Sequence, residues 1–193
     1  MEWSKYRELL SSSEYRYNVP ALFADREAFH AFLDEITAPY DPDDVDHIAG
    51  IDALGFVPGA VMARELDAGL ISVRKGGKLP IDEAYRISDS LVDYTGEEKT
   101  LELDVRMVPD GCRVVLVDDW METASQVTTA LELLEQAGAD IVGISVLGAE
   151  ENETPRRLEA EYGVHSIRPW HELGTPERER ESRDATQRCR WSV

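Results

Sequence analysis

The chain has 193 residues, of which 42% are hydrophobic, and its formal net charge is -19. This length and hydrophobic fraction predict one domain with a substantial core. The strong negative charge argues against nucleic-acid binding and anionic-membrane binding, because like charges repel. The 2 cysteines form no metal or disulfide framework, nothing resembles a signal peptide, and no apolar run is long enough to span a bilayer. We therefore expect a soluble, cytoplasmic protein, and a salt-rich cytoplasm is one explanation for its acidity.

The two ends of the chain differ from its middle in composition. Residues 1–24 are aromatic-rich, and we expect them to form a small hood segment with a short helix followed by an extended lead-in. Asp25 is a good N-cap for a helix that reaches Ile36, and residues 25–170 form the predicted core. Residues 171–193 are rich in Glu and Arg, which predicts a charged tail that does not order on its own.

Two apolar segments separated by a helix indicate the start of a parallel sheet. Residues 47–51 and 70–73 are expected strands, and residues 57–66 between them are expected to be helical, with Pro58 tolerated in the first turn. The order strand, helix, strand predicts a right-handed crossover. A later strand at 141–147, a charged helix at 155–162 and an edge strand at 164–167 continue the α/β pattern.

A cluster of cations follows the second expected strand. Arg74, Lys75 and Lys78 lie within 5 residues, with Gly76 and Gly77 between them. The glycines allow backbone N–H groups and side chains to converge on one anion. A solvated basic loop is the alternative, and the position directly after a strand favours a phosphate or diphosphate site. Residues 85–100 are polar, and we expect a flexible flap that returns as a strand at 101–105.

The most informative stretch is an apolar run that ends in two carboxylates. Residues 113–117 lack alternation, so they predict a strand covered on both faces. Asp118 and Asp119 come next, where we expect the chain to turn, and a helix spans about 125–136. Ligands of parallel sheets bind beyond the carboxyl ends of strands, and a helix N-terminus attracts phosphate. The pair is thus positioned for the hydroxyls of a sugar phosphate, while a core strand with an acidic helix cap is the alternative.

This stretch resembles the phosphoribosyl diphosphate (PRPP) motif of type I phosphoribosyltransferases, which has a hydrophobic strand, two acidic residues and a small-residue loop containing Thr. The resemblance implies an α/β fold with a central, mostly parallel sheet flanked by helices, a small N-terminal hood and a flexible lid. It implies that Asp118 and Asp119 bind the ribose hydroxyls, act in catalysis, and contact Mg²⁺ indirectly through PRPP. The residues implied for the 5′-phosphate are Glu122, Thr123, Ala124, Ser125 and Gln126. The family usually has glycines in place of Ala124 and Ser125, and glycine permits positive φ.

Two further segments, 50–56 and 74–80, are similar to adenine phosphoribosyltransferases in particular. In that family both segments bind the diphosphate of PRPP, the second partly across a dimer interface, which implies a homodimer. The residues implied for this contact are Asp52, Ala53, Leu54, Arg74, Lys75 and Lys78. Leu54 is a departure, because the family has Arg there.

The lid and the base site are implied by shorter matches. The segment 93–96 occupies the place of the family's Glu-Tyr-Gly lid, which implies that Asp93 assists the purine nitrogen and that Tyr94 lies near the ribose. The segment 18–25 keeps the Pro, Phe and Asp of the family's base-framing segment but lacks its Gly and Arg. Phe23 is thereby implied to stack on a purine base.

Together these resemblances imply PRPP-dependent transfer of phosphoribose to a purine-type nucleobase, with release of diphosphate and with Mg²⁺. A non-catalytic PRPP or nucleotide sensor on the same fold is the alternative. The missing arginines and glycines favour the sensor, whereas the cationic loop and the double aspartate favour turnover.

Overall fold

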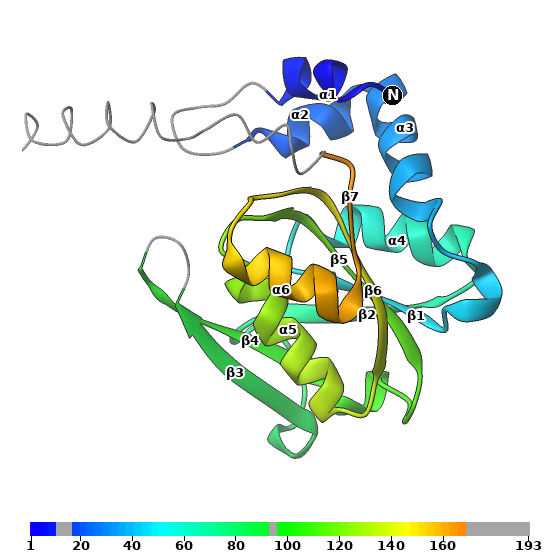
Figure 1. The fold of residues 1–193 in the computed structure, drawn as a ribbon. Coiled ribbons are helices and arrows are strands. Elements are labelled where there is room, and N and C mark those ends of the chain that lie inside the picture. Colours follow the sequence, from blue (N-terminus) through cyan, green and yellow to red (C-terminus); the bar gives the residue numbers. More distant parts are fainter. Residues whose placement is uncertain (11–16, 93–95, 169–193) are drawn as a thin grey trace, which may run out of the picture.

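The computed structural model describes residues 1–10, 17–92 and 96–168. Its centre is a seven-stranded sheet in the order β3-β4-β2-β1-β5-β6-β7 (Figure 1). The strands are β1 (His47–Ile51), β2 (Gly69–Lys75), β3 (Arg86–Val92), β4 (Glu98–Asp104), β5 (Arg113–Met121), β6 (Asp140–Ala149) and β7 (Val164–Ser166). The α-helices are α1 (Trp3–Leu9), α2 (Val19–Ala24), α3 (Arg26–Thr37), α4 (Phe56–Glu65), α5 (Ser125–Gln136) and α6 (Glu153–Tyr162). Short 3₁₀ helices cover Pro42–Asp44, Glu83–Tyr85 and Val105–Met107.

The parallel part of the sheet confirms the predicted α/β order. Strands β2, β1, β5, β6 and β7 are neighbours and run parallel. In β1, His47 is in register with Gly69 of β2 and with Val114 of β5. The carboxyl ends of these central strands therefore lie side by side, which is where a ligand is expected in such a sheet.

The predicted flap is a β-hairpin for most of its length, whereas the sequence predicted a strand only from residue 101. Residues 86–92 form β3, which pairs antiparallel with β4 from Arg86 opposite Asp104 to Val92 opposite Glu98. The side chains of β3 are mostly exposed, so its composition is polar, yet the ladder to β4 satisfies its backbone. The hairpin extends away from the parallel strands in Figure 1. Residues 93–95 at its turn lie outside the described residues.

The predicted turn at the double aspartate is wrong. Strand β5 continues through Asp118 and Asp119 to Met121, because β6 continues to pair with it. Asp118 is opposite Val146, and Met121 is opposite Ala149. The two carboxylates therefore project from a strand that still has a neighbour, which restricts their backbone.

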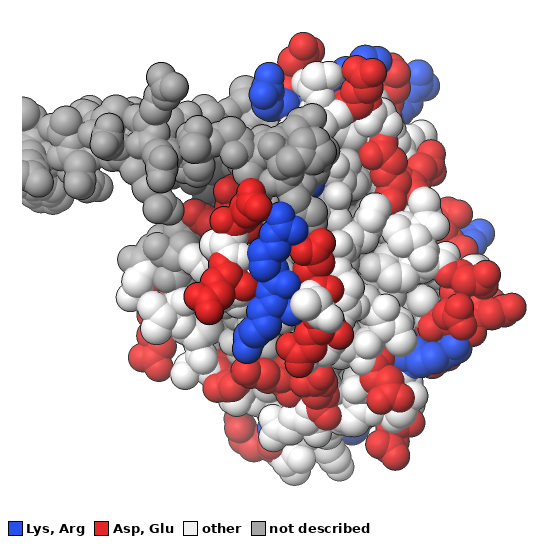
Figure 2. Space-filling view, viewed as in Figure 1, with Lys and Arg blue, Asp and Glu red and all other residues white. Residues whose placement is uncertain are grey.

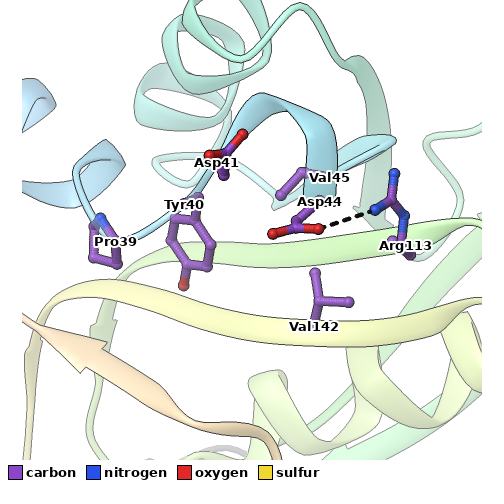
Figure 3. A pocket seen from close by; sticks show the side chains of 7 residues that line it. All are labelled: Pro39, Tyr40, Asp41, Asp44, Val45, Arg113 and Val142. Atoms are coloured by element: carbon purple, nitrogen blue, oxygen red, sulfur yellow. Dashed lines mark hydrogen bonds and ion pairs between the residues drawn. The ribbon is translucent and has the colours of Figure 1, made fainter.

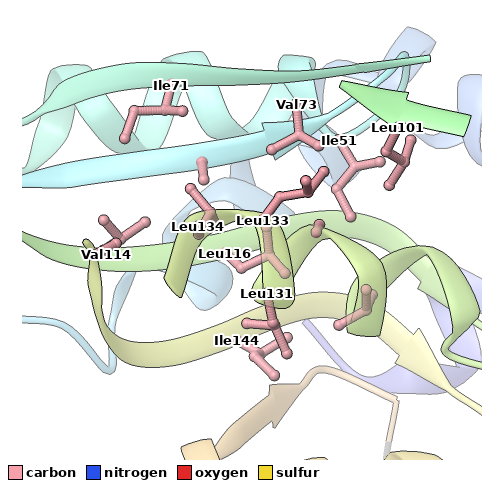
Figure 4. Close-up of a cluster of buried hydrophobic side chains, with 14 of the residues drawn as sticks. Ile51, Ile71, Val73, Leu101, Val114, Leu116, Leu131, Leu133, Leu134 and Ile144 are labelled. Atoms are coloured by element: carbon pink, nitrogen blue, oxygen red, sulfur yellow. The ribbon is translucent and has the colours of Figure 1, made fainter. Parts of the chain in front are cut away.

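Two hydrophobic clusters cover the two faces of the sheet, as expected for strands without alternation. On one face, α5 packs its Leu131, Leu133 and Leu134 over Leu116 and neighbouring strand residues (Figure 4). On the other face, α1 to α4 pack over buried side chains that include those of β1 and β5, such as Ile48, Val115 and Val117. Burial on both faces fixes the strand ends that carry the charged residues.

The amino-terminal segment is more helical than predicted. The short helix α1 is confirmed, but α2 begins at Val19 with Pro20 in its first turn, where the sequence predicted an extended lead-in. Asp25 is confirmed as the N-cap of α3, because its Oδ1 accepts a hydrogen bond from Ala28 N at 2.9 Å. Residues 11–16 and the predicted tail at 171–193 lie outside the described residues.

Acidic side chains are spread over the visible surface, and a short basic stripe among them is bordered by acidic residues (Figure 2). This distribution fits the net charge of -19. None of the helices in the described ranges has both the length and the apolar character needed to cross a membrane.

Candidate active site

Three of the predicted site segments meet at adjacent strand ends. The loop at 52–55 follows β1, the loop at 76–80 follows β2, and the loop at 122–124 follows β5. Because β1 lies between β2 and β5 in the parallel register, the three loops emerge along one edge. The fold thus places the predicted diphosphate loops beside the predicted ribose and phosphate segment.

The first loop is held tightly against the sheet. Asp52 N donates to Val73 O at 3.0 Å, and the Asp52–Ala53 peptide bond is cis. At Gly55, a Cβ atom would lie only 2.6 Å from Val117 O, so only glycine allows this close approach of α4 to β5. Ala53 is exposed, and Leu54 packs against the hood-side hydrophobic cluster.

The Asp52 carboxylate connects the first two loops. Its Oδ2 accepts hydrogen bonds from Arg74 Nε at 3.0 Å and from Lys78 Nζ at 3.1 Å. Burial raises the pKa of Asp52, but the hydrogen bonds from Lys78 and Arg74 outweigh burial and hold that pKa below its ordinary value. Two of the three predicted cations are therefore positioned by Asp52 and point into the same region.

The third cation, Lys75, interacts electrostatically with the carboxylates at the end of β5. Burial raises the pKa of both Asp118 and Asp119, and the positive charge of Lys75 only partly opposes this rise. The Lys75 side chain is partly buried. The cationic loop and the double aspartate therefore interact electrostatically across the intervening strand β1. The structure brings together the two motifs that the sequence separates by more than 40 residues.

The carboxylates at the end of β5 lie in an environment that disfavours their charged forms. Asp118 is 7% exposed and Asp119 is half-buried, and Asp119 N donates to Asp118 Oδ1 at 3.0 Å. Burial and the neighbouring Asp119 charge raise the pKa of Asp118 well above its usual range, and burial raises the pKa of Asp119. Within the described residues neither carboxylate forms an ion pair. Such a pair is suited to a ligand that brings hydroxyl donors and positive charge.

The loop after β5 contains a positive-φ residue at a position where the resembled family has glycine. Ala124 adopts a left-handed conformation with φ 61° and precedes α5 without a side-chain cap. This conformation costs an L-residue about 1–2 kcal/mol. Thr123 Oγ1 and Ser125 Oγ are 3.0 Å apart, so small hydroxyl groups lie at the positive end of the α5 dipole.

The same loop is fastened on its outer side. Asn152 Nδ2 donates to the carbonyl oxygen of Glu122 at 2.7 Å, and Glu150 N donates to Met121 O at 2.8 Å. The Glu122 side chain is exposed and Gln126 is half-buried. The loop at 122–126 is therefore ordered by the start of α6 and presents Thr123, Ser125 and the first turn of α5.

The predicted lid and base residues have different outcomes. Asp93 and Tyr94 lie outside the described residues, so their roles stay predictions. Phe23 is half-buried, and its ring lies 5.4 Å from the Phe29 ring and 5.8 Å from the Phe32 ring between centroids. Phe23 thus belongs to an aromatic cluster of the hood, and its contact with a base also stays a prediction.

The sequence did not indicate a second aromatic cluster next to the double aspartate. Trp120 lies 4.3 Å from Tyr17 between ring centroids, and the Arg168 guanidinium lies 5.2 Å from the Trp120 ring. Arg168 is buried and donates to Glu150 Oε1 at 3.0 Å. The position of Trp120 directly after Asp119 was a usable signal, whereas nothing in the sequence pointed to Arg168.

A hollow at the opposite edge of the sheet is unrelated to these residues. It is lined by Tyr40, Arg113, Val142 and their neighbours near the amino ends of β5 and β6 (Figure 3). Arg113 Nη2 is 3.0 Å from Asp46 Oδ1, and its Nη1 is 3.5 Å from Asp44 Oδ1. Because Asp41 and Asp44 line the hollow beside this single guanidinium, the charge of its lining is net negative, which disfavours a phosphate.

Comparison with known proteins agrees with this geometry. The family described as "Phosphoribosyl transferase domain" matches residues 21–180 of the chain. The chain belongs to the phosphoribosyltransferase family. Adenine phosphoribosyltransferase from Rhizobium meliloti is 39% identical over 144 residues, which are 74% of this chain and 78% of that protein. Adenine phosphoribosyltransferase from Brucella anthropi is 41% identical over 125 residues, covering 65% of this chain and 67% of that protein.

Solved structures show the same fold. The crystal structure of adenine phosphoribosyltransferase from Thermoanaerobacter pseudethanolicus matches with a TM-score of 0.77 at 24% identity, covering 86% of this chain and 98% of that chain. The predicted type I phosphoribosyltransferase fold is therefore confirmed. The three strand-end loops described above contain the segments for which the sequence motifs predicted PRPP contacts, and these contacts stay predictions.

Proposed function

We propose that this phosphoribosyltransferase transfers phosphoribose from PRPP to adenine and releases diphosphate, as an enzyme of purine salvage. The relatives from Rhizobium meliloti and Brucella anthropi carry the name adenine phosphoribosyltransferase. The observation that supports the proposal best is that the loops after β1, β2 and β5 emerge along one sheet edge, which also carries the Asp118 and Asp119 pair. A sugar with a phosphate at one end and a diphosphate at the other fits an edge that has a helix N-terminus on one side and cations on the other.

In this proposal the donor lies along the three loops. The ribose hydroxyls donate to Asp118 and Asp119, and the 5′-phosphate accepts hydrogen bonds from the loop at 122–126. The diphosphate lies between the loop at 52–54 and the cations Arg74, Lys75 and Lys78. Each contact pairs an anion or a hydroxyl with a group of complementary charge or polarity.

The donor set also fits Mg²⁺ held through the substrate. Among the described residues, no group of three or more His, Cys, Asp or Glu side chains is arranged to hold a metal ion. Mg²⁺ usually keeps several waters and binds substrate phosphates with few protein ligands, so Asp118 and Asp119 would contact it indirectly, through the PRPP that they hold. When bound, Mg²⁺ neutralises charge on the departing diphosphate.

The reaction needs positioning and charge stabilisation more than covalent chemistry. The acceptor nitrogen forms a bond to C1 of the ribose while the bond from C1 to the diphosphate oxygen breaks, and the diphosphate keeps the electron pair. Arg74, Lys75 and Lys78 stabilise this leaving group. Asp93 assists the purine nitrogen, Tyr94 contacts the ribose, and Phe23 contacts the base.

The remaining organisation is proposed on the same basis. A homodimer, a cytoplasmic location and a division into hood (1–24), core (25–170) and charged tail (171–193) follow from the family resemblance and the composition. Light scattering coupled to size-exclusion chromatography tests the dimer, for which a mass twice the 21.7 kDa chain is expected.

The direct test of the function is incubation with PRPP, Mg²⁺ and a panel of nucleobases. Diphosphate release that requires adenine is the expected result. Release with a different base would correct the acceptor. Tight PRPP binding without release under any base would replace the enzyme with the alternative, a PRPP sensor.

A further inference from the structure

The loop between β2 and β3 is built around a carboxylate from inside the protein. Glu102 of β4 is 2% exposed, and its Oε1 accepts hydrogen bonds from Lys78 N and Leu79 N, both at 2.6 Å. Gly76 N donates to Thr100 O at 2.8 Å. The loop is therefore fastened to β4 by several of its backbone donors.

This carboxylate occupies the position that the sequence assigned to a bound anion. Gly77 has φ 77°, and consecutive N–H groups near such a residue form a concave anion-binding nest. Burial raises the pKa of Glu102, but hydrogen bonds from Leu79 N and Lys78 N outweigh burial and lower that pKa. Since an internal anion already uses these donors, the prediction that the backbone N–H groups of this loop converge on a ligand is not supported here. The positive charge available to a ligand comes from the side chains.

Arg86 of β3 contacts both Glu102 and the carbonyl groups of the loop. Its Nε is 3.3 Å from Glu102 Oε2 in an ion pair. Its Nη2 donates to Leu79 O at 2.9 Å and to Ile81 O at 3.2 Å. Glu102 thus holds the loop's N–H groups while Arg86 holds its carbonyl groups.

The consequence is a fixed position for Lys78. Its backbone N–H donates to Glu102 Oε1. Its Nζ donates to Asp52 Oδ2 at 3.1 Å, and Arg74 Nε donates to the same oxygen at 3.0 Å. We propose that Glu102 is a positioning residue for diphosphate binding, because it fills the nest of the loop and thereby orients Lys78 and its neighbours toward the ligand. The identity of the anion as diphosphate rests on the proposed function.

The competing explanation is that Glu102 only stabilises the β3–β4 hairpin. In that case, removing its carboxylate lowers stability and leaves ligand affinity unchanged. Asp104 is a matched control, because it lies on the same strand, is similarly buried and pairs with Arg106, two residues along the chain.

The test compares Glu102→Leu, Glu102→Gln and Asp104→Asn in the full chain. Calorimetry measures the affinity for inorganic diphosphate with Mg²⁺, and steady-state kinetics measures KM for PRPP and for adenine separately. Glu102→Leu is expected to weaken diphosphate binding and raise KM for PRPP by about 10-fold or more, because misplaced charges lose binding energy steeply. Glu102→Gln is expected to change both by less than about threefold, since its amide oxygen still accepts the two N–H groups. KM for adenine and the Asp104→Asn variant are expected to stay near wild type.

Unchanged diphosphate affinity in a folded Glu102→Leu variant overturns the proposal, and so does an equal loss in Asp104→Asn. If Glu102→Leu does not fold, Glu102→Asp provides the test, because it keeps the charge and withdraws the carboxylate from Lys78 N and Leu79 N by one carbon. Weaker diphosphate binding in Glu102→Asp then supports the proposal, and unchanged binding overturns it. Diphosphate binding does not require turnover, so an inactive wild type that still binds diphosphate contradicts only the proposed function. A wild type that binds no diphosphate contradicts both.

Discussion

On the β2–β4 side of the site, the carboxylates of Asp52 and Glu102 are buried and have lowered pKa values, whereas on the β5 side the carboxylates of Asp118 and Asp119 have raised pKa values. Burial opposes ionisation in all four. The difference lies in the partners: Asp52 has two cationic donors and Glu102 has two backbone donors. Asp118 has a second carboxylate beside it, and the positive charge of Lys75 only partly compensates.

This comparison separates structural carboxylates from functional ones. Asp52 and Glu102 orient cations, and their charge is satisfied without a ligand. Among the described residues, Asp118 and Asp119 form no ion pair, and burial disfavours their charged forms. This is unfavourable in the free protein and is the kind of cost that binding sites retain. The variants below change one carboxylate on one side at a time.

The largest effect is expected at the Asp118 and Asp119 pair. Asp119→Asn is expected to weaken PRPP binding in the presence of Mg²⁺ by about 10–100-fold, since a hydrogen bond to a charged group contributes about 1.5–3 kcal/mol. Calorimetric titration measures the loss, and circular dichroism checks that the variant is folded. Asp140→Asn at the opposite edge of the sheet is the control. Equal PRPP affinity in Asp119→Asn and wild type would remove the ribose assignment.

Asp118→Asn is expected to stabilise the free protein while lowering activity. The asparagine can still accept from Asp119 N, and it removes a buried charge, so a gain of about 1 kcal/mol and about 2–4 °C in Tm is expected. Because the folded pKa is raised, the stability contributed by protonated Asp118 is present below its unfolded pKa near about 3.9 and is lost as pH rises through the folded pKa. The gain in the variant should therefore be larger at pH 8 than at pH 5. A variant that melts below wild type at pH 8 contradicts this assignment.

Asp52→Asn is expected to destabilise the protein, in contrast to Asp118→Asn. It removes the partner of two cations and should lower the free energy of unfolding by only about 1 kcal/mol, because the Arg74 and Lys78 side chains are 33% and 47% exposed and are screened by solvent. Since the folded pKa is lowered, this stability is present above the unfolded pKa and is lost as pH falls through the folded pKa. Urea denaturation at pH 7 and pH 3 measures the difference, with Glu65→Gln as an exposed control. A difference that persists undiminished at low pH would count against the Asp52 pairing.

The smallest effect is expected from salt. Raising KCl from about 0.1 M to about 1 M shortens the screening length from about 10 Å to about 3 Å, which weakens the self-repulsion of a chain with net charge -19. Tm is expected to rise, and the rise should be similar in wild type and Asp118→Asn, because buried charges are screened much less. A Tm that falls with added KCl contradicts the view of the acidic surface as a salt-adapted one.

The sequence predicted those parts of the fold that depend on residues close together in the chain. The apolar run of β5, the N-cap Asp25 and the crossover from β1 to β2 were all found from residue order, as was the double aspartate beside a small-residue loop. Strand β3 was missed because its exposed Ser88, Asp89 and Ser90 resemble a loop, and only the ladder to β4 makes it a strand.

The missed parts of the site depend on contacts between distant residues. Glu102 lies 24 residues from Lys78, whose N–H it accepts, and Arg168 reaches Trp120 from a different strand end. The left-handed Ala124 shows a different limit, because the backbone adopts the conformation that glycine would favour without glycine being present. The conformational preference of a residue alone therefore does not predict the backbone conformation that the surrounding packing imposes.

A crystal structure with PRPP and Mg²⁺ bound tests the central claim most directly. The account predicts the ribose hydroxyls on Asp118 and Asp119, the 5′-phosphate on the loop at 122–126, and the diphosphate beside Lys75 and Lys78. Density for PRPP elsewhere, or a Glu122 side chain filling the phosphate position, would contradict it.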